Sequence, residues 1–190
     1  MALPGTKDTT QILAGGAEVK IGVYAANGVD NGAANKTFGH TLSPTELGFA
    51  FEDFEVETEQ SIGKVITVPV AASYTLKFDI AQNDPEAMLI ATRMTSGQLT
   101  GAALGAKTLA FTDPSAIYYQ VALVGPGYGS TSHTDTYTFW RCQVTSIDNI
   151  PFGKRAVQHL AVTMKVLRDD SAGAGTGYLT KGFYGVRIQT

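Results

Sequence analysis

The strongest constraint on the fold is an alternation of apolar and polar side chains with a period of two residues. Residues 73–80 read SYTLKFDI, in which an aromatic or aliphatic side chain occupies every second position. This period places alternate side chains on one face of an extended chain, whereas a helix repeats its apolar positions every three to four residues. The pattern therefore predicts a strand that buries one face, made of Tyr74, Leu76, Phe78 and Ile80.

Similar segments recur along the chain and are separated by Gly, Pro, Asn and Asp. The predicted strands are 17–25, 47–59, 64–80 with a break at Pro69, 115–125, 135–148, 156–169 and 183–189. Within 135–148, alternation places Trp140, Cys142 and Val144 on one face and Phe139 on the other. Many short strands with turn signals between them are typical of a mainly β fold. We expect residues 1–190 to form a single domain, a β-sandwich or barrel.

One segment has helical character, and it lies at about residues 84–95. Asp84 is a good N-cap acceptor, Pro85 suits the first helical position, and Glu86 lies near the positive end of the helix dipole. The predicted buried stripe consists of Ala87, Met88, Ala91 and Met94. The helix is therefore expected to flank the β-structure.

Two glycine-rich segments interrupt the strand pattern. The first lies near residues 27–40, and the second is SAGAGTG at residues 171–177. Glycine and asparagine favour turns and open conformations, so both segments are predicted to be flexible loops.

The bulk composition excludes several classes of protein. Hydrophobic residues make up 44% of the chain and charged residues 16%, which is typical of a globular protein. The net charge of −3 argues against binding nucleic acid through its phosphates, because that requires a cationic surface. The one cysteine, Cys142, excludes an internal disulfide. We expect no membrane insertion, because no apolar run approaches the length of a membrane span.

The sequence predicts no catalytic residue, no cofactor site and no metal site. His40, His133 and His159 lack the spacing of metal ligands, and we interpret them as surface residues. GAALGAKT at residues 101–108 departs from a phosphate-binding loop because Ala106 separates the glycine from the lysine, so it is predicted to be an ordinary loop. Cys142 alternates with apolar residues, which indicates a buried structural thiol. An enzyme is therefore not expected.

The segment FEDFEVETEQS, residues 51–61, carries an acidic row of Asp53, Glu55, Glu57 and Glu59 on one strand face. Residues on the same face of a strand are spaced by roughly 6.6–7 Å, so these carboxylates form a line rather than converge on a cation. Either the row is a plain solvated face, or it has an external use that offsets the repulsion between like charges.

Residues 51–91 resemble the tail tube proteins of tailed bacteriophages. The matching parts follow the same order in this chain: Glu55 to Gly63, Tyr74 to Asp79, and Asp84 to Ala91. Two further segments extend the resemblance over most of the chain: ILAGGAEVKIGVY at 12–24 and TFWRCQVTSIDNIPFGKRAVQHLAVTMKVLRD at 138–169. The least matched part lies between Gly101 and Gly129.

The resemblance implies a structural protein of the virion tail, made in the bacterial host cytoplasm. Proteins of that family form hexameric rings that stack into a tube, the conduit for ejection of genomic DNA. Their other partners are the tape measure, terminator and tail-tip or baseplate proteins. On this interpretation Asp53, Glu55, Glu57 and Glu59 face the lumen, while Phe54 and Val56 pack into the subunit core. DNA carries one charge per ~1.7 Å of axis, so an acidic wall would repel it and prevent sticking.

Alternatives remain open from the sequence. The tube protein of a type VI or related contractile secretion apparatus shares the ring-stacking architecture. A carbohydrate-binding or adhesion module on a β-sandwich would require clustered exposed aromatics, for which Tyr118, Tyr137 and Phe139 are candidates.

Overall fold

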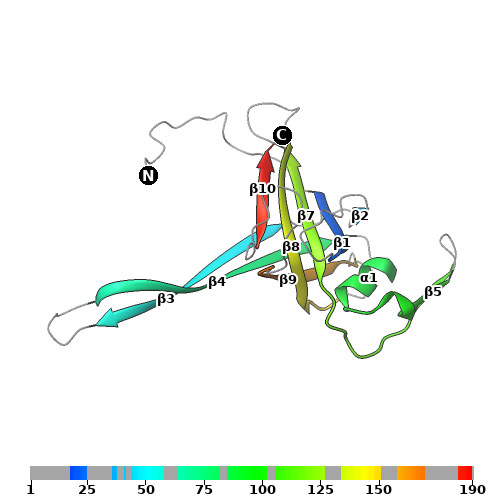
Figure 1. The fold of residues 1–190 in the computed structure, drawn as a ribbon. Helices are drawn as coiled ribbons and strands as arrows, with labels where there is room; N and C mark the ends of the chain where they lie inside the picture. The colour runs from blue at the N-terminus through cyan, green and yellow to red at the C-terminus, as the bar shows by residue number, and fades with distance from the viewer. Residues whose placement is uncertain are drawn as a thin grey trace.

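The computed structural model describes about three fifths of the chain. The described residues are 18–24, 36–37, 41, 44–57, 64–81, 85–101, 106–126, 134–150, 158–169 and 184–189. Within these ranges the fold is mainly β with one α-helix, as predicted (Figure 1).

The elements follow the predicted order closely. The strands are β1 (Glu18–Val23), β2 (Lys36–Thr37), β3 (Glu46–Glu57), β4 (Lys64–Ile80), β5 (Leu99–Gly101), β6 (Lys107–Leu109), β7 (Tyr119–Pro126), β8 (Thr134–Ile147), β9 (Leu160–Leu167) and β10 (Gly185–Gln189). The helices are α1 (Pro85–Ala91) and the short 3-10 helix η3 (Ser96–Gln98). Strand β2 falls inside the predicted 27–40 loop, whose other residues lie outside the described part, as do residues 171–177.

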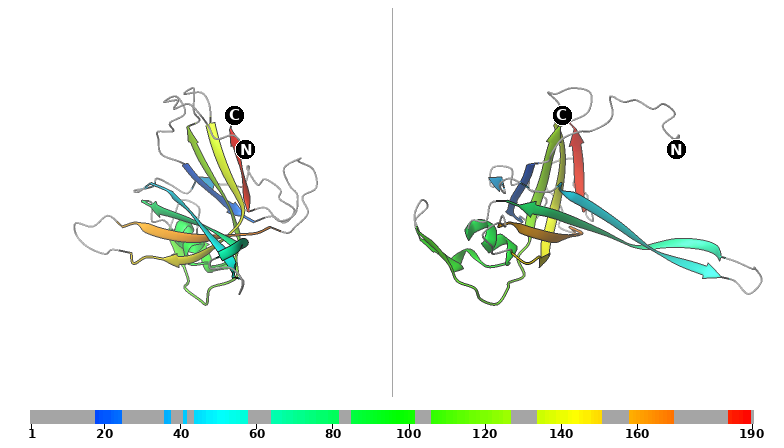
Figure 2. Two further views of the ribbon diagram at one scale, coloured as in Figure 1. Left: turned by 90° about the vertical axis from the view of Figure 1, so that its left-hand side faces the viewer. Right: turned by 180° about the vertical axis from the view of Figure 1, so that it is seen from behind.

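The main sheet is antiparallel and has the strand order β2-β1-β7-β8-β9-β4-β3. Strand β10 also pairs with β8, along Asp135–Phe139, and β9 takes over that side of β8 from Arg141 onward. The sheet curls around the core, giving the barrel-like shape seen in Figure 2. Helix α1 and the separate β5–β6 hairpin lie at one side of this body.

The inner face of the curled sheet forms the core, and alternation identifies most of its members. Leu76, Phe78 and Ile80 of β4 are at most 1% exposed, as the sequence predicted. Val162 and Met164 of β9 are fully buried beside them. The period-two pattern therefore reports the buried face of these two strands correctly.

Strand β8 departs from simple alternation. Tyr119 of β7 pairs with Cys142 while Val121 pairs with Phe139, so Trp140 and Arg141 together oppose a single β7 residue. This β-bulge shifts the phase of the strand by one residue. Phe139 consequently joins Cys142 in the core, and the prediction that these two side chains lie on opposite faces is wrong.

Helix α1 begins at Pro85 as predicted but ends at Ala91, four residues before the expected end. Arg93 adopts a left-handed conformation with φ of 57°. The Arg93 N–H donates to the Ile90 carbonyl at 3.1 Å, and the Met94 N–H donates to the Leu89 carbonyl at 3.0 Å. These two bonds form a Schellman C-cap, which closes the helix. Met94 is still buried, but from beyond the helix.

Strand β4 continues through Pro69 without the predicted break. It pairs with β9 only from Tyr74 to Ile80, whereas its pairing with β3 extends from Lys77 back to Lys64. At Pro69, β4 therefore has a strand neighbour on one side only, and the missing N–H of proline is tolerated at such an edge.

Candidate functional site

The most unusual feature of the described residues is the projecting end of the β3–β4 hairpin. We call residues 50–57 and 64–73 the arm. Beyond Tyr74 these two strands have left β9 and the rest of the sheet, so the arm is a two-stranded ribbon. Residues 50–57 span roughly 24 Å at the usual rise of a strand. Figure 1 and Figure 2 both show the ribbon extending well clear of the body.

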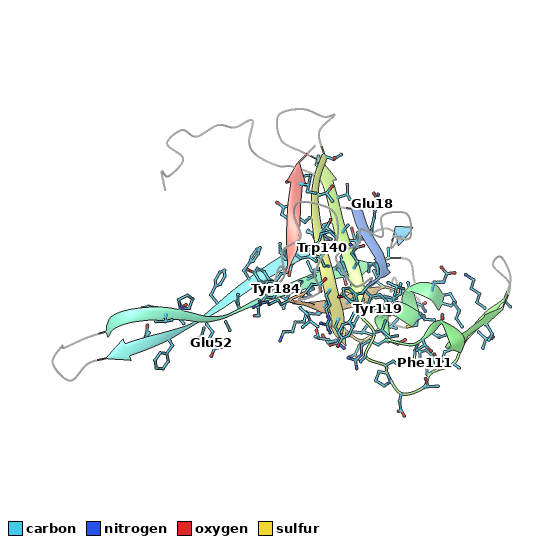
Figure 3. All side chains as sticks on the ribbon, viewed as in Figure 1. Glu18, Glu52, Phe111, Tyr119, Trp140 and Tyr184 are labelled. Atoms are coloured by element: carbon cyan, nitrogen blue, oxygen red, sulfur yellow. The ribbon has the colours of Figure 1, made fainter. Side chains whose placement is uncertain are left out.

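Aromatic side chains fasten the base of the arm to the body. The ring of Tyr74 lies 5.4 Å from that of Phe49 in an edge-to-face arrangement and 4.6 Å from that of Tyr184. The Tyr184 hydroxyl also donates a hydrogen bond of 3.2 Å to the carbonyl of Ala72 (labelled Tyr184 in Figure 3). These contacts orient the arm where it leaves the body.

The polarity of the two faces reverses part-way along the arm. Toward the base, the face of β3 that continues from the core carries Phe49 and Phe51. Farther out, the same face carries Asp53 and Glu55, because alternate residues share a face. The opposite face becomes apolar toward the tip of the arm, where it carries Phe54, which pairs with Val68.

The reversal coincides with a register shift between the strands. Glu52 pairs with Ala71 while Asp53 pairs with Pro69, which leaves Val70 as an extra residue on β4. Such a bulge increases the local twist of a ribbon. The two strands cross one another about midway along the arm in Figure 1 and Figure 2. Apolar side chains therefore wind around the arm instead of forming one flat face.

The arm and its base expose several large apolar side chains. Their exposed fractions are 57% for Phe49, 69% for Phe51, 60% for Phe54, 46% for Val68 and 62% for Val70. The expectation that Phe54 packs into the core of its own subunit is therefore wrong. An isolated two-stranded ribbon is only marginally stable in water, and contiguous exposed apolar surface marks an interaction site.

The acidic row of the sequence analysis falls on this arm. Asp53 and Glu55 are exposed and share one face of β3. Glu57 is the last residue of β3 and follows a second register shift, and Glu59 lies outside the described residues. No group of three or more potential metal ligands occurs in the described ranges. Asp53 and Glu55 thus form an exposed acidic pair on one face of the arm.

A second feature is an apolar groove that sequence patterns did not indicate. It has a volume of about 460 Å³ and lies between the end of β1, helix α1 and the segment that leads into β7. Ile21 and Tyr119, both core residues, line it together with Ile90. Val23, which also lines the groove, is 66% exposed. The groove combines residues from distant segments, so no local pattern could have revealed it.

Two ionisable side chains are buried near these features. Burial raises the pKa of Tyr119 to about 12, although the nearby Arg93 guanidinium acts in the opposite direction. The Tyr119 hydroxyl is buried and has no hydrogen-bond partner among the described residues. Burial also raises the pKa of the Cys142 thiol strongly, and this side chain is fully buried, in agreement with the predicted structural thiol.

The remaining sequence candidates show no catalytic arrangement in the described ranges. Lys107, from the loop-like GAALGAKT segment, lies on β6 and forms an ion pair of 2.7 Å with Glu86 at the start of α1. His159 is partly buried, whereas His40 and His133 lie outside the described residues.

None of the helices in the described ranges is both long and apolar enough to span a membrane. Comparison of the sequence with protein-family models and with curated proteins finds no match.

Proposed function

We propose that this protein is a structural subunit that self-associates into stacked, hexameric rings and forms the tail tube of a bacteriophage. The observation that carries the proposal is the arm, which leaves the body as a two-stranded ribbon and exposes apolar side chains on both faces. The sequence resemblance supplies the type of assembly. In this assembly no residue has a catalytic role, and the tube is the conduit for DNA.

The free energy available from covering the arm is substantial. Full burial of a phenylalanine side chain contributes roughly 1.5–3 kcal/mol. Phe49, Phe51 and Phe54 are each about 60% exposed. Covering what remains exposed would therefore contribute roughly 3–5 kcal/mol per copy. Such a contribution favours association over a permanently monomeric state.

The edges of the sheet support the same conclusion. Strand β3 ends the sheet on one side, and β2, with only two residues, ends it on the other. Exposed edge strands tend to pair with further strands unless they are covered. Pairing between the edge of one copy and the opposite edge of the next is a head-to-tail contact, which closes into a ring when the rotation between copies allows.

The acidic row has a defined place in this assembly. Near the body, the face of β3 that carries Leu47 contacts the core, so it cannot line a channel there. Asp53 and Glu55 lie beyond that point, where this face is exposed. We therefore place the lumen-facing part of the row along the arm, where it would repel DNA phosphates and keep passing DNA from adhering.

Electron microscopy of the purified full-length chain at increasing concentration tests the proposal. We expect rings or tubes of uniform width with a central channel. Phe111, which is 67% exposed and outside the arm, provides a matched control site. Phe54→Ser should raise the concentration at which assembly begins, and Phe111→Ser should not. A chain that remains monomeric at every concentration, even with its tail partners, would exclude a tube protein.

A further inference from the structure

The groove and the distal end of the arm lie on opposite sides of the molecule. In Figure 1 and in the reverse view of Figure 2, the arm extends from one side of the body, while α1 and β5 lie on the other. The arm of one copy therefore cannot reach its own groove. Any contact between these two apolar surfaces must join different copies in a head-to-tail arrangement.

We propose that the groove between β1 and α1 binds the distal apolar face of the arm from a neighbouring copy, with Phe54 as the inserted side chain. This inference rests on the proposed self-association and identifies the surface that receives the arm. The contact is heterologous, so each copy donates one arm and accepts another.

The face of the arm that carries Phe54 leaves large apolar side chains uncovered. Phe54 is 60% exposed, and Val68, which pairs with it, is 46% exposed. A phenylalanine buries about 150–250 Å² when fully covered, so the uncovered part of Phe54 amounts to roughly 90–150 Å². Phe49 and Phe51 share the other face with Asp53 and Glu55, so they do not contribute to this contact. Insertion into a concave site covers such side chains better than contact with a flat surface.

The groove has the composition of a site for an apolar anchor. Its interior is lined by Ile21, Leu89, Ile90 and Met94. The flexible thioether of methionine adapts to an inserted ring. Polar residues also line the groove, including Thr95 and the ion-paired Glu86. Interfaces commonly surround a dry apolar centre with such a polar rim.

Charge determines which face of the arm enters the groove. Phe54 and Val68 point to one side of the distal ribbon, whereas Asp53 and Glu55 point to the other. Insertion of the acidic face would bring carboxylates toward Glu86 and remove them from water, which is costly. Insertion of the Phe54 face leaves the acidic row in solvent. The docking orientation is therefore compatible with a row that faces an aqueous channel.

Disulfide cross-linking between engineered cysteines tests the contact. The native Cys142 is fully buried, so an introduced cysteine is the reactive thiol at the described surface. We would mix a Phe54→Cys variant with a Val23→Cys variant under mild oxidation. Both positions are largely exposed, so both variants should fold, with thermal midpoints within a few degrees of that of the natural chain. Ile188→Cys on β10, 38% exposed, replaces Val23→Cys in the control mixture.

The expected result is a covalent dimer in the Phe54→Cys and Val23→Cys mixture, several times more abundant than in the control mixture. A chain carrying both substitutions should give a ladder of covalent oligomers, because each copy then has a donor and an acceptor. Predominant Phe54→Cys homodimers would indicate an arm-to-arm contact and overturn the inference.

The outcomes also separate this inference from the proposed function. Rings or tubes in the microscope without cross-linking above the control would reject the groove as the receiving site and leave the tube proposal standing. Cross-linking without closed rings would support the groove contact and reject the tube. Absence of both would reject both.

Discussion

Replacement of Phe54 by alanine separates the stability of one copy from the stability of the contact between copies. Phe54 is 60% exposed in the single chain. Full burial of its side chain is worth roughly 1.5–3 kcal/mol, so the covered two fifths contributes about 1 kcal/mol or less to folding. The exposed three fifths is available to assembly and corresponds to about 1–2 kcal/mol per contact.

These magnitudes predict two different responses to Phe54→Ala. The free energy of unfolding, measured by urea denaturation at low protein concentration, should fall by about 1 kcal/mol or less. The critical concentration for assembly, measured by light scattering and sedimentation, should rise about 5–30-fold, which is the factor equivalent to 1–2 kcal/mol. The Phe111→Ala variant removes an equally exposed ring from outside the arm and should leave the critical concentration unchanged.

The result that would refute this reasoning is an equal effect of the two substitutions on assembly. Such a result would mean that general surface hydrophobicity, rather than the arm, drives association. A large loss of unfolding free energy in Phe54→Ala alone would instead show that the ring stabilises its own copy, contrary to its exposure.

Three further predictions address the acidic row, the base of the arm and the buried tyrosine. Replacing the four carboxylates at 53, 55, 57 and 59 by their amides should preserve assembly and slow DNA release, measured as the ejection rate of assembled particles; an unchanged rate would contradict a repulsive lumen. Tyr184→Phe removes the 3.2 Å hydrogen bond to Ala72 and should lower the unfolding free energy by about 0.5–1.5 kcal/mol, measured by denaturation, whereas no change would mean that this bond does not stabilise the base. Tyr119 has a pKa of about 12 in the folded chain against 10.0 for the free side chain, so the unfolded state loses its proton first and stability should fall as pH rises from about 10 to about 12. Tyr119→Phe should reduce this decline in a pH series of thermal melts, and an identical decline in both proteins would count against the raised pKa.

The strands of the body were predictable because their signals are local. Alternation in β4 depends only on neighbouring residues, and it identified Leu76 and Phe78 as core side chains. Pro85 likewise marked the start of α1. These features follow from the periodicity of a strand and from the fixed φ of proline.

Features that depend on distant residues were not predictable. Phe139 and Trp140 are adjacent and both apolar, so the sequence cannot indicate which of them faces the core, and the bulge against β7 decides it. The end of α1 was missed because Arg93, not glycine, takes the left-handed position. The arm itself exists because β9 pairs with β4 only as far as Tyr74, which no pattern within β3 or β4 reveals.

The same dependence on distant residues changes the meaning of the acidic row. Alternation alone suggested an acidic face backed by the core of the same subunit, but the backing side chain Phe54 is exposed. The distal arm therefore has one apolar face and one acidic face, and among the described residues nothing covers the apolar face, because Phe54 and Val68 are exposed. A ribbon with one apolar face and one acidic face is suited to form a wall between a protein interface and an aqueous channel. Because the polarity reverses only beyond the body, next to the bulge at Val70, that wall should lie where arms from different copies meet.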